Sequence, residues 1–546
     1  STFSVSSNIT ASNGRFLLQQ GAISNFTTRT ATLKGFKIIS SNSGNYTFNN
    51  FSTSTSNLLN LTDSLVISNS TLSTFYLQYY YSTGGYYVYH NVNITTGSFF
   101  VNNSTITNFI ARNINVSNGS IKFESNSAGN FNTAFTCSSD FQIKDSPVNW
   151  NITNFSDATA SAGGNFTISN SQCSFNAYRN FISVTGNFLI ETKPVTWTSQ
   201  YPVTVNGDYS VLNSSSSITL TNYYPATLYV RGNFTLNSAM TYSVYATNFT
   251  AITTGKTINP AGKIFTNVNF TGNGGAWTML NDFVATGDVS HQFGTFISNG
   301  YKVDYGLGLN ANYSNLLTLN YTGTDTIRAK AYYTLSASTN TTLNIASAVI
   351  KINTTNTNVT ASFNGGGKTF NDVYLVQSGL TYANGITISG TNTKYEKLYI
   401  ILDRNGPVNF NNGTLYYKDV YVDYRSATSA TSSISITGAN TWYDLRVTSP
   451  KVLLTTVISA SNTFDTLAMP NGTSFTFQSG ITQNWNAFVT DGLCDNIPIY
   501  KSSTAGSQAT LNDLNGGTTN LNYINIKDIK ITGGIWNASN VINGGN

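Results

Sequence analysis

Charged residues are scarce in this chain. Asp, Glu, Lys and Arg make up 9% of its 546 residues, whereas soluble domains usually contain roughly 25%. The net charge is +5, and the Lys and Arg residues form no basic cluster along the sequence. Because affinity for a phosphate backbone depends on clustered cations, we expect no nucleic-acid partner. Ser, Thr and Asn supply most of the polar side chains instead.

Cysteine is nearly absent, with Cys137, Cys173 and Cys494 as the three residues present. A low and odd count excludes a disulfide-stapled scaffold. Cys137 and Cys173 would meet if they lay one or two coils apart in a repeat fold, so a bond between them is left open. The preferred interpretation of all three is a small buried apolar side chain. No CxxC or His/Cys spacing is present, so we expect no metal and no cofactor.

Long apolar runs and helical patterns are also missing. No run of about 18 apolar residues occurs, so we expect no membrane span. The chain starts at Ser1 without a basic region followed by an apolar stretch, so a signal peptide has been removed or never existed. Aromatic and β-branched residues dominate, with 33 Tyr and 33 Phe. This composition favours strands over helices and excludes a disordered chain.

A short motif repeats in the middle of the chain. Each copy has a glycine, Asn or Asp, an aromatic residue, one further residue and an aliphatic residue. The copies are 164–168, 186–190, 207–211 and 232–236, at steps of 22, 21 and 25 residues. Such a period is typical of a repeat architecture. Stacked coils would place one polar side chain from each copy in a column at a turn, where they hydrogen-bond along the column: Asn165, Asn187, Asp208 and Asn233.

A second pattern consists of an aromatic residue, an aliphatic residue three positions later and another two beyond. It occurs at 265–270, 370–375, 395–400, 417–422, 442–447 and 464–467. It predicts one column of charged side chains at Asp372, Lys397, Asp419 and Asp444, with Glu396 and Lys418 in the next column. Both patterns predict an all-β parallel β-helix, or β-solenoid, with three short strands per coil and coils of about 22–25 residues. An array of β-sandwiches would repeat at roughly 100 residues, and no such period is present.

We expect three parts: an irregular β-rich part at 1–160, a regular solenoid at 161–474 and a C-terminal solenoid segment at 475–546. The first part contains a Tyr-rich segment at 75–90 with two glycines between its aromatic runs, which predicts a hairpin. Its tyrosines are candidates for contact with a glycan or a partner subunit; the alternative is an aromatic ladder packed on the solenoid. These residues are Tyr79, Tyr80, Tyr81, Tyr86 and Tyr87.

The C-terminal segment carries a resemblance. It contains YKSSTAGSQATL at 500–511, YINIKD at 523–528 and TGGIWNA at 532–538, and it ends in NGGN at 543–546. It is similar to a recurrent segment of β-helical proteins of phage virions and of large bacterial or archaeal surface proteins. In that family the pattern commonly continues into a Gly-Trp that is missing here. The resemblance implies an extracellular or virion structural role and supplies no catalytic residue.

One set of residues is a candidate for catalysis. Asp419, Asp423 and Arg425 share strand parity, and a polysaccharide-cleaving β-helix would need carboxylates near a cation. The preferred alternative is a ladder of charges that pairs adjacent coils. His90 and His291 show no triad or metal-ligand arrangement. We therefore expect no catalytic residues.

Asn-x-Ser/Thr sequons occur at roughly two dozen places, which makes a glycoprotein one interpretation. At Asn165 and Asn233 a sequon coincides with the predicted column, and the two roles exclude each other if the amide is buried. The candidates for glycosylation are Asn8, Asn25, Asn93, Asn151, Asn269, Asn320 and Asn471.

The end coils of a solenoid have unpaired backbone groups, and the sequence shows no cap-like amphipathic helix at either end. The function expected is therefore that of a non-enzymatic, extracellular, self-associating subunit of a filament, sheath, surface layer or virion fibre on a cell or virion surface. The alternative is an adhesin or phage adsorption fibre that binds glycans. A polysaccharide-cleaving enzyme is the third possibility.

Overall fold

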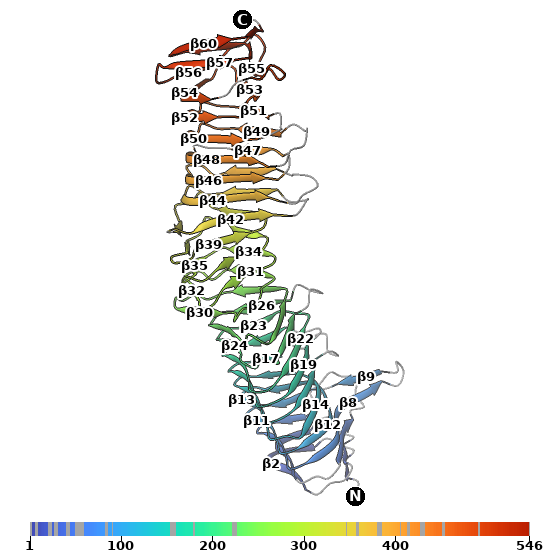
Figure 1. The fold of residues 1–546 in the computed structure, drawn as a ribbon. Coiled ribbons are helices and arrows are strands. Elements are labelled where there is room, and N and C mark those ends of the chain that lie inside the picture. Colours follow the sequence, from blue (N-terminus) through green and yellow to red (C-terminus); the bar gives the residue numbers. More distant parts are fainter. Residues whose placement is uncertain are drawn as a thin grey trace. The chain divides into compact units, whose positions relative to one another are not determined.

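The structure is a computed structural model of the chain, and the regular elements of its described part are all β-strands (Figure 1). No helix in the described part is long and apolar enough to cross a bilayer. The chain forms two compact units, Ser1–Asn281 and Asp282–Asn546. Residues 3–544 are described except 6–8, 20–23, 27–30, 40–43, 50–58, 82–85, 90, 153–159, 178–180, 221–225, 346, 356–359, 379–384, 404–405, 412–414, 426–431, 450–453 and 490–491; side chains are further left out for most residues up to 50 and for 71, 73–74, 78–81 and 86–88.

In the middle of the first unit each coil has three short strands, and each strand pairs in parallel with the strand one coil later. The first column contains β15 (Phe141–Lys144), β18 (Phe166–Ser169), β21 (Phe188–Glu191), β24 (Tyr209–Val211) and β27 (Phe234–Leu236). The second contains β16 (Val148–Asn151), β19 (Cys173–Ala177), β22 (Val195–Ser199), β25 (Ser217–Leu220) and β28 (Thr241–Val244). The third contains β17 (Ala160–Ala162), β20 (Ile182–Val184), β23 (Val203–Val205), β26 (Thr227–Val230), β29 (Ala246–Phe249) and β31 (Asn267–Phe270). The predicted parallel β-helix is confirmed.

Some strands before this region are longer. β8 (Thr71–Tyr81), β12 (Thr105–Val116) and β14 (Ala128–Cys137) pair side by side, with register shifts in the β12–β14 pair. β8 also pairs antiparallel with β9 (Tyr86–Tyr89), which confirms the predicted hairpin. Figure 1 shows this hairpin projecting sideways from the coils around it.

The second unit contains a twelve-stranded parallel sheet. Its strands are β33 (Phe283–Val284), β36 (Val303–Asp304), β39 (Thr326–Ala329), β42 (Val349–Thr354), β44 (Thr369–Gln377), β46 (Lys394–Leu402), β48 (Tyr416–Tyr424), β50 (Thr441–Thr448), β52 (Thr463–Ala468), β54 (Thr482–Val489), β56 (Ala509–Asp513) and β59 (Ile529–Thr532). Opposite them run β43 (Ala361–Asn364), β45 (Ile386–Ser389), β47 (Val408–Phe410), β49 (Ser432–Ile436) and β51 (Leu454–Ile458). Among the described residues, a coil from β44 to β51 therefore has one long and one short strand, which differs from the predicted three short strands per coil.

The long strands need no third strand because each contains a bend. In β46, β48 and β50 two consecutive residues face outward before the alternation of buried and outward residues resumes. At the bend the same long strand passes from one side of the coil to the next. The pattern at 370–467 marks these strands, whereas 265–270 ends in β31 (Asn267–Phe270), which belongs to the third column of the first unit. The assignment of 265–270 to the second pattern is therefore wrong.

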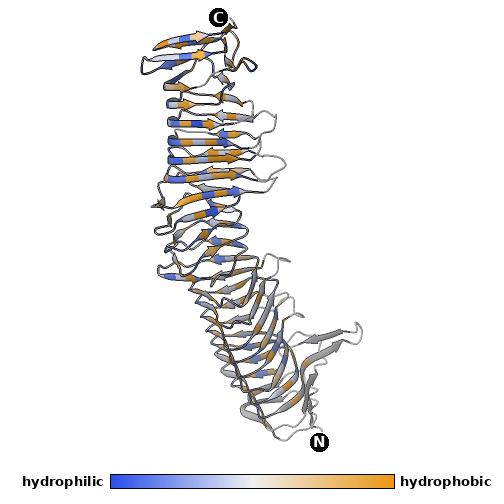
Figure 2. Ribbon diagram, viewed as in Figure 1, coloured by the Kyte–Doolittle hydropathy of each residue, from blue (hydrophilic) through white to orange (hydrophobic). Residues whose placement is uncertain are grey.

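The core of both units is built from stacked side chains at the buried positions of the strands, and Figure 2 shows apolar and polar residues alternating along many of them. In the first unit Phe166, Phe188 and Tyr209 stack coil on coil, with ring centroids 5.1 and 4.9 Å apart. In the second unit Tyr417 and Trp442 stack at 4.1 Å. Each coil thus buries aromatic area against its neighbours, which is the main source of stability in a solenoid.

Candidate binding surface: the outward columns of the coils

The polar column of the first unit is confirmed. The backbone N–H of Asn187 donates to Asn165 Oδ1 at 2.9 Å, and the N–H of Asp208 donates to Asn187 Oδ1 at 2.8 Å. The bonds thus join a side chain to the next backbone, rather than amide to amide as in the predicted ladder. The column continues in both directions through Asp140, which accepts from Asn165, through Asp208, which accepts from Asn233, and through Asn233, which accepts from Thr257.

The glycines of this motif are required by close approach between coils. A Cβ added to Gly186 would lie 2.6 Å from Asn165 Oδ1 and 2.8 Å from the backbone carbonyl carbon of Gly164. The Gly186 N–H donates to the Gly164 carbonyl at 2.8 Å. A side chain at Gly186 would push the two coils apart. It would break the bond from Gly186 to Gly164 and the bond from Asn187 to Asn165, so the glycine of the motif sets the spacing between coils.

Several predicted glycosylation sites lie in amide ladders. Asn93 donates from Nδ2 to Asn60 and accepts from Asn115, both at 2.9 Å. Asn269 donates from Nδ2 to Asn248 at 2.7 Å. A glycan is joined through Nδ2, so modification of Asn93 or Asn269 requires the ladder bond to break.

At the other predicted sequons whose side chains are described, the asparagine Nδ2 donates none of the hydrogen bonds found among the described residues. Asn151 and Asn320 act as acceptors, from Asn176 and from Thr322, and Asn471 is exposed. Asn165 is also exposed and uses only its carbonyl oxygen in the column, so the column and a glycan do not exclude each other there. Asn8 lies outside the described residues, as does the side chain of Asn25.

The tyrosines of the hairpin are placed by their backbone. Tyr79 pairs with Val88, Tyr80 with Tyr87 and Tyr81 with Tyr86. Their side chains lie outside the described part, so the choice between a glycan contact and a packed ladder stays a prediction.

The charged column of the second unit is confirmed. Asp372, Lys397, Asp419 and Asp444 are in register on β44, β46, β48 and β50. In the next column the Lys418 ammonium lies 2.9 Å from Glu396, which joins adjacent coils as predicted.

Two residues of the candidate catalytic set, Asp423 and Arg425, form an ion pair. Asp423 pairs with Arg425 of its own coil at 2.8 Å and accepts from Thr448 at 3.0 Å. Asp444 likewise pairs with Arg446 of its own coil at 3.0 Å. Asp423 and Asp444 thus form ion pairs within a coil rather than between coils. The described residues contain no group of three or more His, Cys, Asp or Glu side chains arranged to hold a metal.

A column that sequence reasoning missed lies beside the charged one. Tyr374, Tyr399 and Tyr421 are in register and stack outside the core, with centroids 4.5 and 5.2 Å apart and ring planes 11° from parallel. Partial burial raises the pKa of the Tyr374 and Tyr399 phenols. A signal was available, because each tyrosine lies between the two aliphatic residues of the second pattern.

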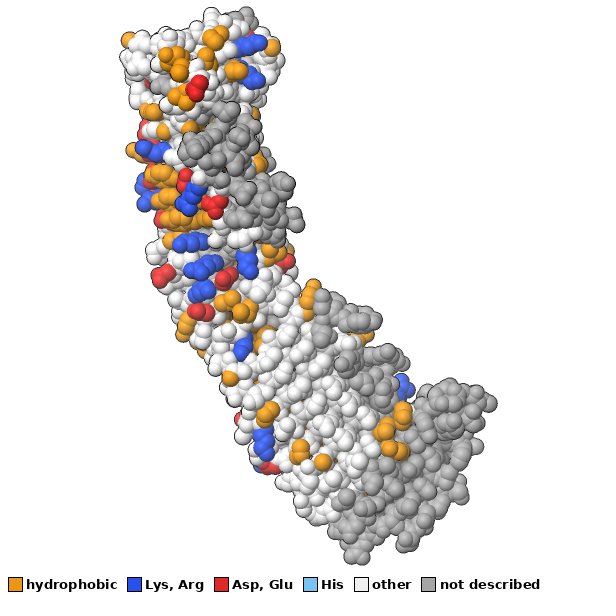
Figure 3. Space-filling view, turned by 45° about the vertical axis from the view of Figure 1, so that its right-hand side comes forward, with side chains coloured by type: hydrophobic (Ala, Val, Ile, Leu, Met, Phe, Trp, Pro, Cys, Tyr) orange, Lys and Arg blue, Asp and Glu red, His pale blue; other side chains and the backbone are white. Residues whose placement is uncertain are grey.

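In the coils before Tyr374, the same column contains charged side chains, two of which are cations. Asp304, Arg328 and Lys351 precede Tyr374 in register on β36, β39 and β42. The Lys351 ammonium lies over the Tyr374 ring, 5.4 Å from its centroid. Figure 3 shows Lys and Arg side chains gathered on this unit, with fewer on the described part of the first unit. The fold thus assembles a basic cluster that is invisible along the sequence.

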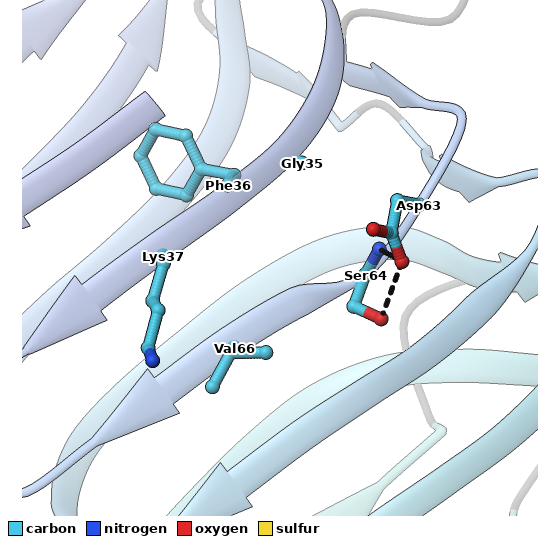
Figure 4. Close-up of a pocket in the computed structure, with 6 residues that line it drawn as sticks. All are labelled: Gly35, Phe36, Lys37, Asp63, Ser64 and Val66. Carbon is cyan, nitrogen blue, oxygen red and sulfur yellow. Dashed lines mark hydrogen bonds between the residues drawn. The ribbon is translucent and has the colours of Figure 1, made fainter. Parts of the chain in front are cut away.

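A small pocket of about 220 Å³ lies in the first unit, beside β4 (Ala31–Ile39) and β7 (Leu65–Ser68) (Figure 4). Lys37 and Val66 are in register at its wall. Asp63 accepts from the backbone N–H and the hydroxyl of Ser64, at 2.8 and 3.0 Å. The Ser64 hydroxyl oxygen also accepts the Ser98 N–H at 3.0 Å, so these bonds hold the turn against the next coil.

The remaining reactive side chains are mostly buried. His291 is 1% exposed, and burial lowers its pKa to about 3. Cys137 and Cys173 are buried and free, and burial raises the pKa of each thiol to about 12. The three cysteines form no disulfide. The expectation that all three are buried is wrong for Cys494, which is exposed. His90 lies outside the described residues.

The fold defines the chain as a parallel β-solenoid. Comparison with protein-family models, with curated proteins and with solved structures finds no match. The fold agrees with the resemblance to β-helical repeat proteins, and no match points to virion or surface proteins in particular.

Proposed function

We propose that the chain is a non-enzymatic extracellular structural protein, a self-associating solenoid subunit of a surface assembly such as a filament, sheath, surface layer or virion fibre. The observation that carries the proposal is the column from Asp140 to Thr257. There one polar side chain per coil is used to hold the next coil's backbone in register. Side chains used in this way contribute to shape and stacking rather than to turnover of a substrate.

Self-association is supported by exposed apolar side chains on the last described strands of the second unit. Ile531 is 36% exposed, although it is in register with Leu511, which is 1% exposed. Ala538 is exposed, although its partner Leu521 is buried. Ile535 of β60 (Ile535–Ser539) is 61% exposed. Ile531 and Ala538 thus expose positions that are buried in the preceding coil, and Ile535 adds a third exposed apolar side chain. Exposed apolar side chains favour a contact with another β-coil, and our proposal assigns this contact to a second copy of the chain.

Sedimentation or light scattering at physiological salt tests the proposal. We expect oligomers, and we expect Ile531→Asp with Ile535→Asp to weaken association at least tenfold, because an unpaired carboxylate would be buried at the contact. Leu316→Asp is the control, since Leu316 is 67% exposed elsewhere in the same unit. A chain that stays monomeric at all concentrations contradicts self-association. Polysaccharide cleavage that Asp419→Ala abolishes contradicts the non-enzymatic part.

A second candidate is an adhesin that binds glycans. It is favoured by the β8–β9 hairpin, because this antiparallel pair leaves the parallel stack and carries the Tyr-rich segment. Deleting residues 79–89 would abolish glycan-array binding of an adhesin and leave a purely structural subunit unaffected.

A further inference from the structure

An unbalanced group of cations lies on the outer face of β39 and β42. Arg328 and Lys351 are exposed and directly in register on adjacent strands. Lys330 is exposed two residues beyond Arg328 and therefore lies on the same side of the chain. None of these three cations belongs to the ion pairs found among the described residues.

Like charges directly opposite on neighbouring strands are destabilising. The carboxylate in register with Arg328 belongs to Asp304, and its Oδ1 accepts the Gly306 N–H at 3.1 Å. The Lys351 ammonium lies over the ring of Tyr374, which is in register with Lys351 on the strand opposite to that of Arg328. An anionic ligand that spans the two coils would relieve this repulsion.

The tyrosines extend the cationic group along the same column. One face of the Tyr374 ring is covered by Lys351 and the other by Tyr399, and Arg446 follows Tyr421 in register. The ring faces within the stack are thus occupied. The exposed parts are the ring edges and the phenolic hydroxyls, which donate and accept hydrogen bonds. The column therefore offers two in-register cations followed by a row of hydroxyls.

We propose that this column binds an acidic polysaccharide that runs across the coils, with its anionic groups at Arg328, Lys330 and Lys351 and its hydroxyls at the tyrosines. The spacing between coils, about 4.8 Å, is close to the length of one sugar unit in an extended chain. The neighbouring column contains Asp372, Asp419 and Asp444. These carboxylates accept hydrogen bonds from sugar hydroxyls, so an acidic glycan with many hydroxyls fits better than a nucleic acid.

The test measures binding of the full chain to immobilised alginate, which is carboxylated, and to dextran sulfate, with neutral dextran as the reference. We expect binding to at least one acidic polymer and none to dextran, with an affinity that falls as salt is added. Arg328→Gln with Lys351→Gln should weaken binding at least tenfold. Both side chains are exposed and their mutual repulsion is removed, so the melting temperature of the variant should be no lower than that of the parent chain.

The matched control is Lys501→Gln with Lys527→Gln. These lysines are also exposed and in register, on β55 (Ile499–Ser502) and β58 (Asn525–Lys527), but without a tyrosine column. We expect this variant to bind as the parent chain does. An equal loss in both variants, binding to neither acidic polymer, or equal binding to single-stranded DNA would each overturn the proposal. The outcome is independent of self-association, which is measured without polysaccharide.

Discussion

The two units join their coils by different means. In the first unit the polar column runs from side-chain oxygens to backbone N–H groups, and it is formed largely by asparagines. In the second unit the outward columns contain Asp, Lys, Arg and stacked Tyr. Of the chain's 22 Asp and Glu residues, 15 belong to the second unit as a whole. A bond to the backbone fixes the register of a coil, whereas a charged side chain facing outward remains available to solvent and to ligands. The difference indicates a scaffolding first unit and a second unit with a surface suited to binding.

The largest effect is expected from the aromatic core. Trp150 packs against Phe131 and Phe175, with centroids 5.1 and 5.9 Å away, and its indole N–H donates to Thr133. Trp442 packs between Tyr417 and Phe464. Trp150→Ala and Trp442→Ala should each destabilise their own unit by about 3–5 kcal/mol, because a large cavity is created. Hydrogen exchange should show faster exchange near the substitution in one unit and little change in the other. Equal loss of protection in both units would show that they unfold together.

A smaller effect is expected from pH, because the buried His291 makes the stability of the second unit depend on pH. Burial lowers the pKa of His291 to about 3, whereas an unfolded histidine titrates near 6.5. The unfolded state therefore binds more protons between these values, so stability is complete above about pH 6.5 and falls as the pH drops. The second unit should be about 2–3 kcal/mol less stable at pH 4.5 than at pH 7 from this group alone. His291→Phe should remove this part of the acid sensitivity in urea denaturation; an unchanged pH dependence would assign the effect to other groups.

The smallest effects compare the two kinds of column. Asn187→Ala removes an acceptor of a backbone N–H, so we expect a loss of about 1 kcal/mol that added salt does not change. Lys418→Gln removes an exposed ion pair with Glu396, so we expect no measurable change in melting temperature at physiological salt. Thermal melts at low and high salt check both. A larger loss for Lys418→Gln than for Asn187→Ala would reverse the comparison.

Much of the fold follows from the spacing of a few residues. The steps between the Gly-Asn-aromatic motifs equal the spacing of the paired residues Phe166, Phe188, Tyr209 and Phe234, because one motif in each coil fixes the length of that coil. The number of strands per coil was harder to predict from the sequence. Two outward residues in succession, such as Lys418 and Asp419, show a bend only when the burial of both is known.

The candidate site was only partly predictable. The Asp372 column followed from the register, because charged residues recur at a fixed offset. The cationic group did not, because Arg328 and Lys351 are separated by a full coil in the sequence and their proximity depends on pairing of β39 with β42. The tyrosine column could have been recognised from its offset. Ion pairing within a coil, as for Asp423 and Arg425, depends on side-chain direction at a strand end, which the sequence pattern does not specify.

The polar column of the first unit also has a mechanical consequence. Its bonds, like those between paired strands, run from one coil to the next. Tension along the stacking direction would therefore load the junctions in series, and the weakest junction would set the breaking force of the unit. Each asparagine or aspartate in the column adds one more bond to its junction, so the column would raise the force that every junction between Asp140 and Thr257 withstands.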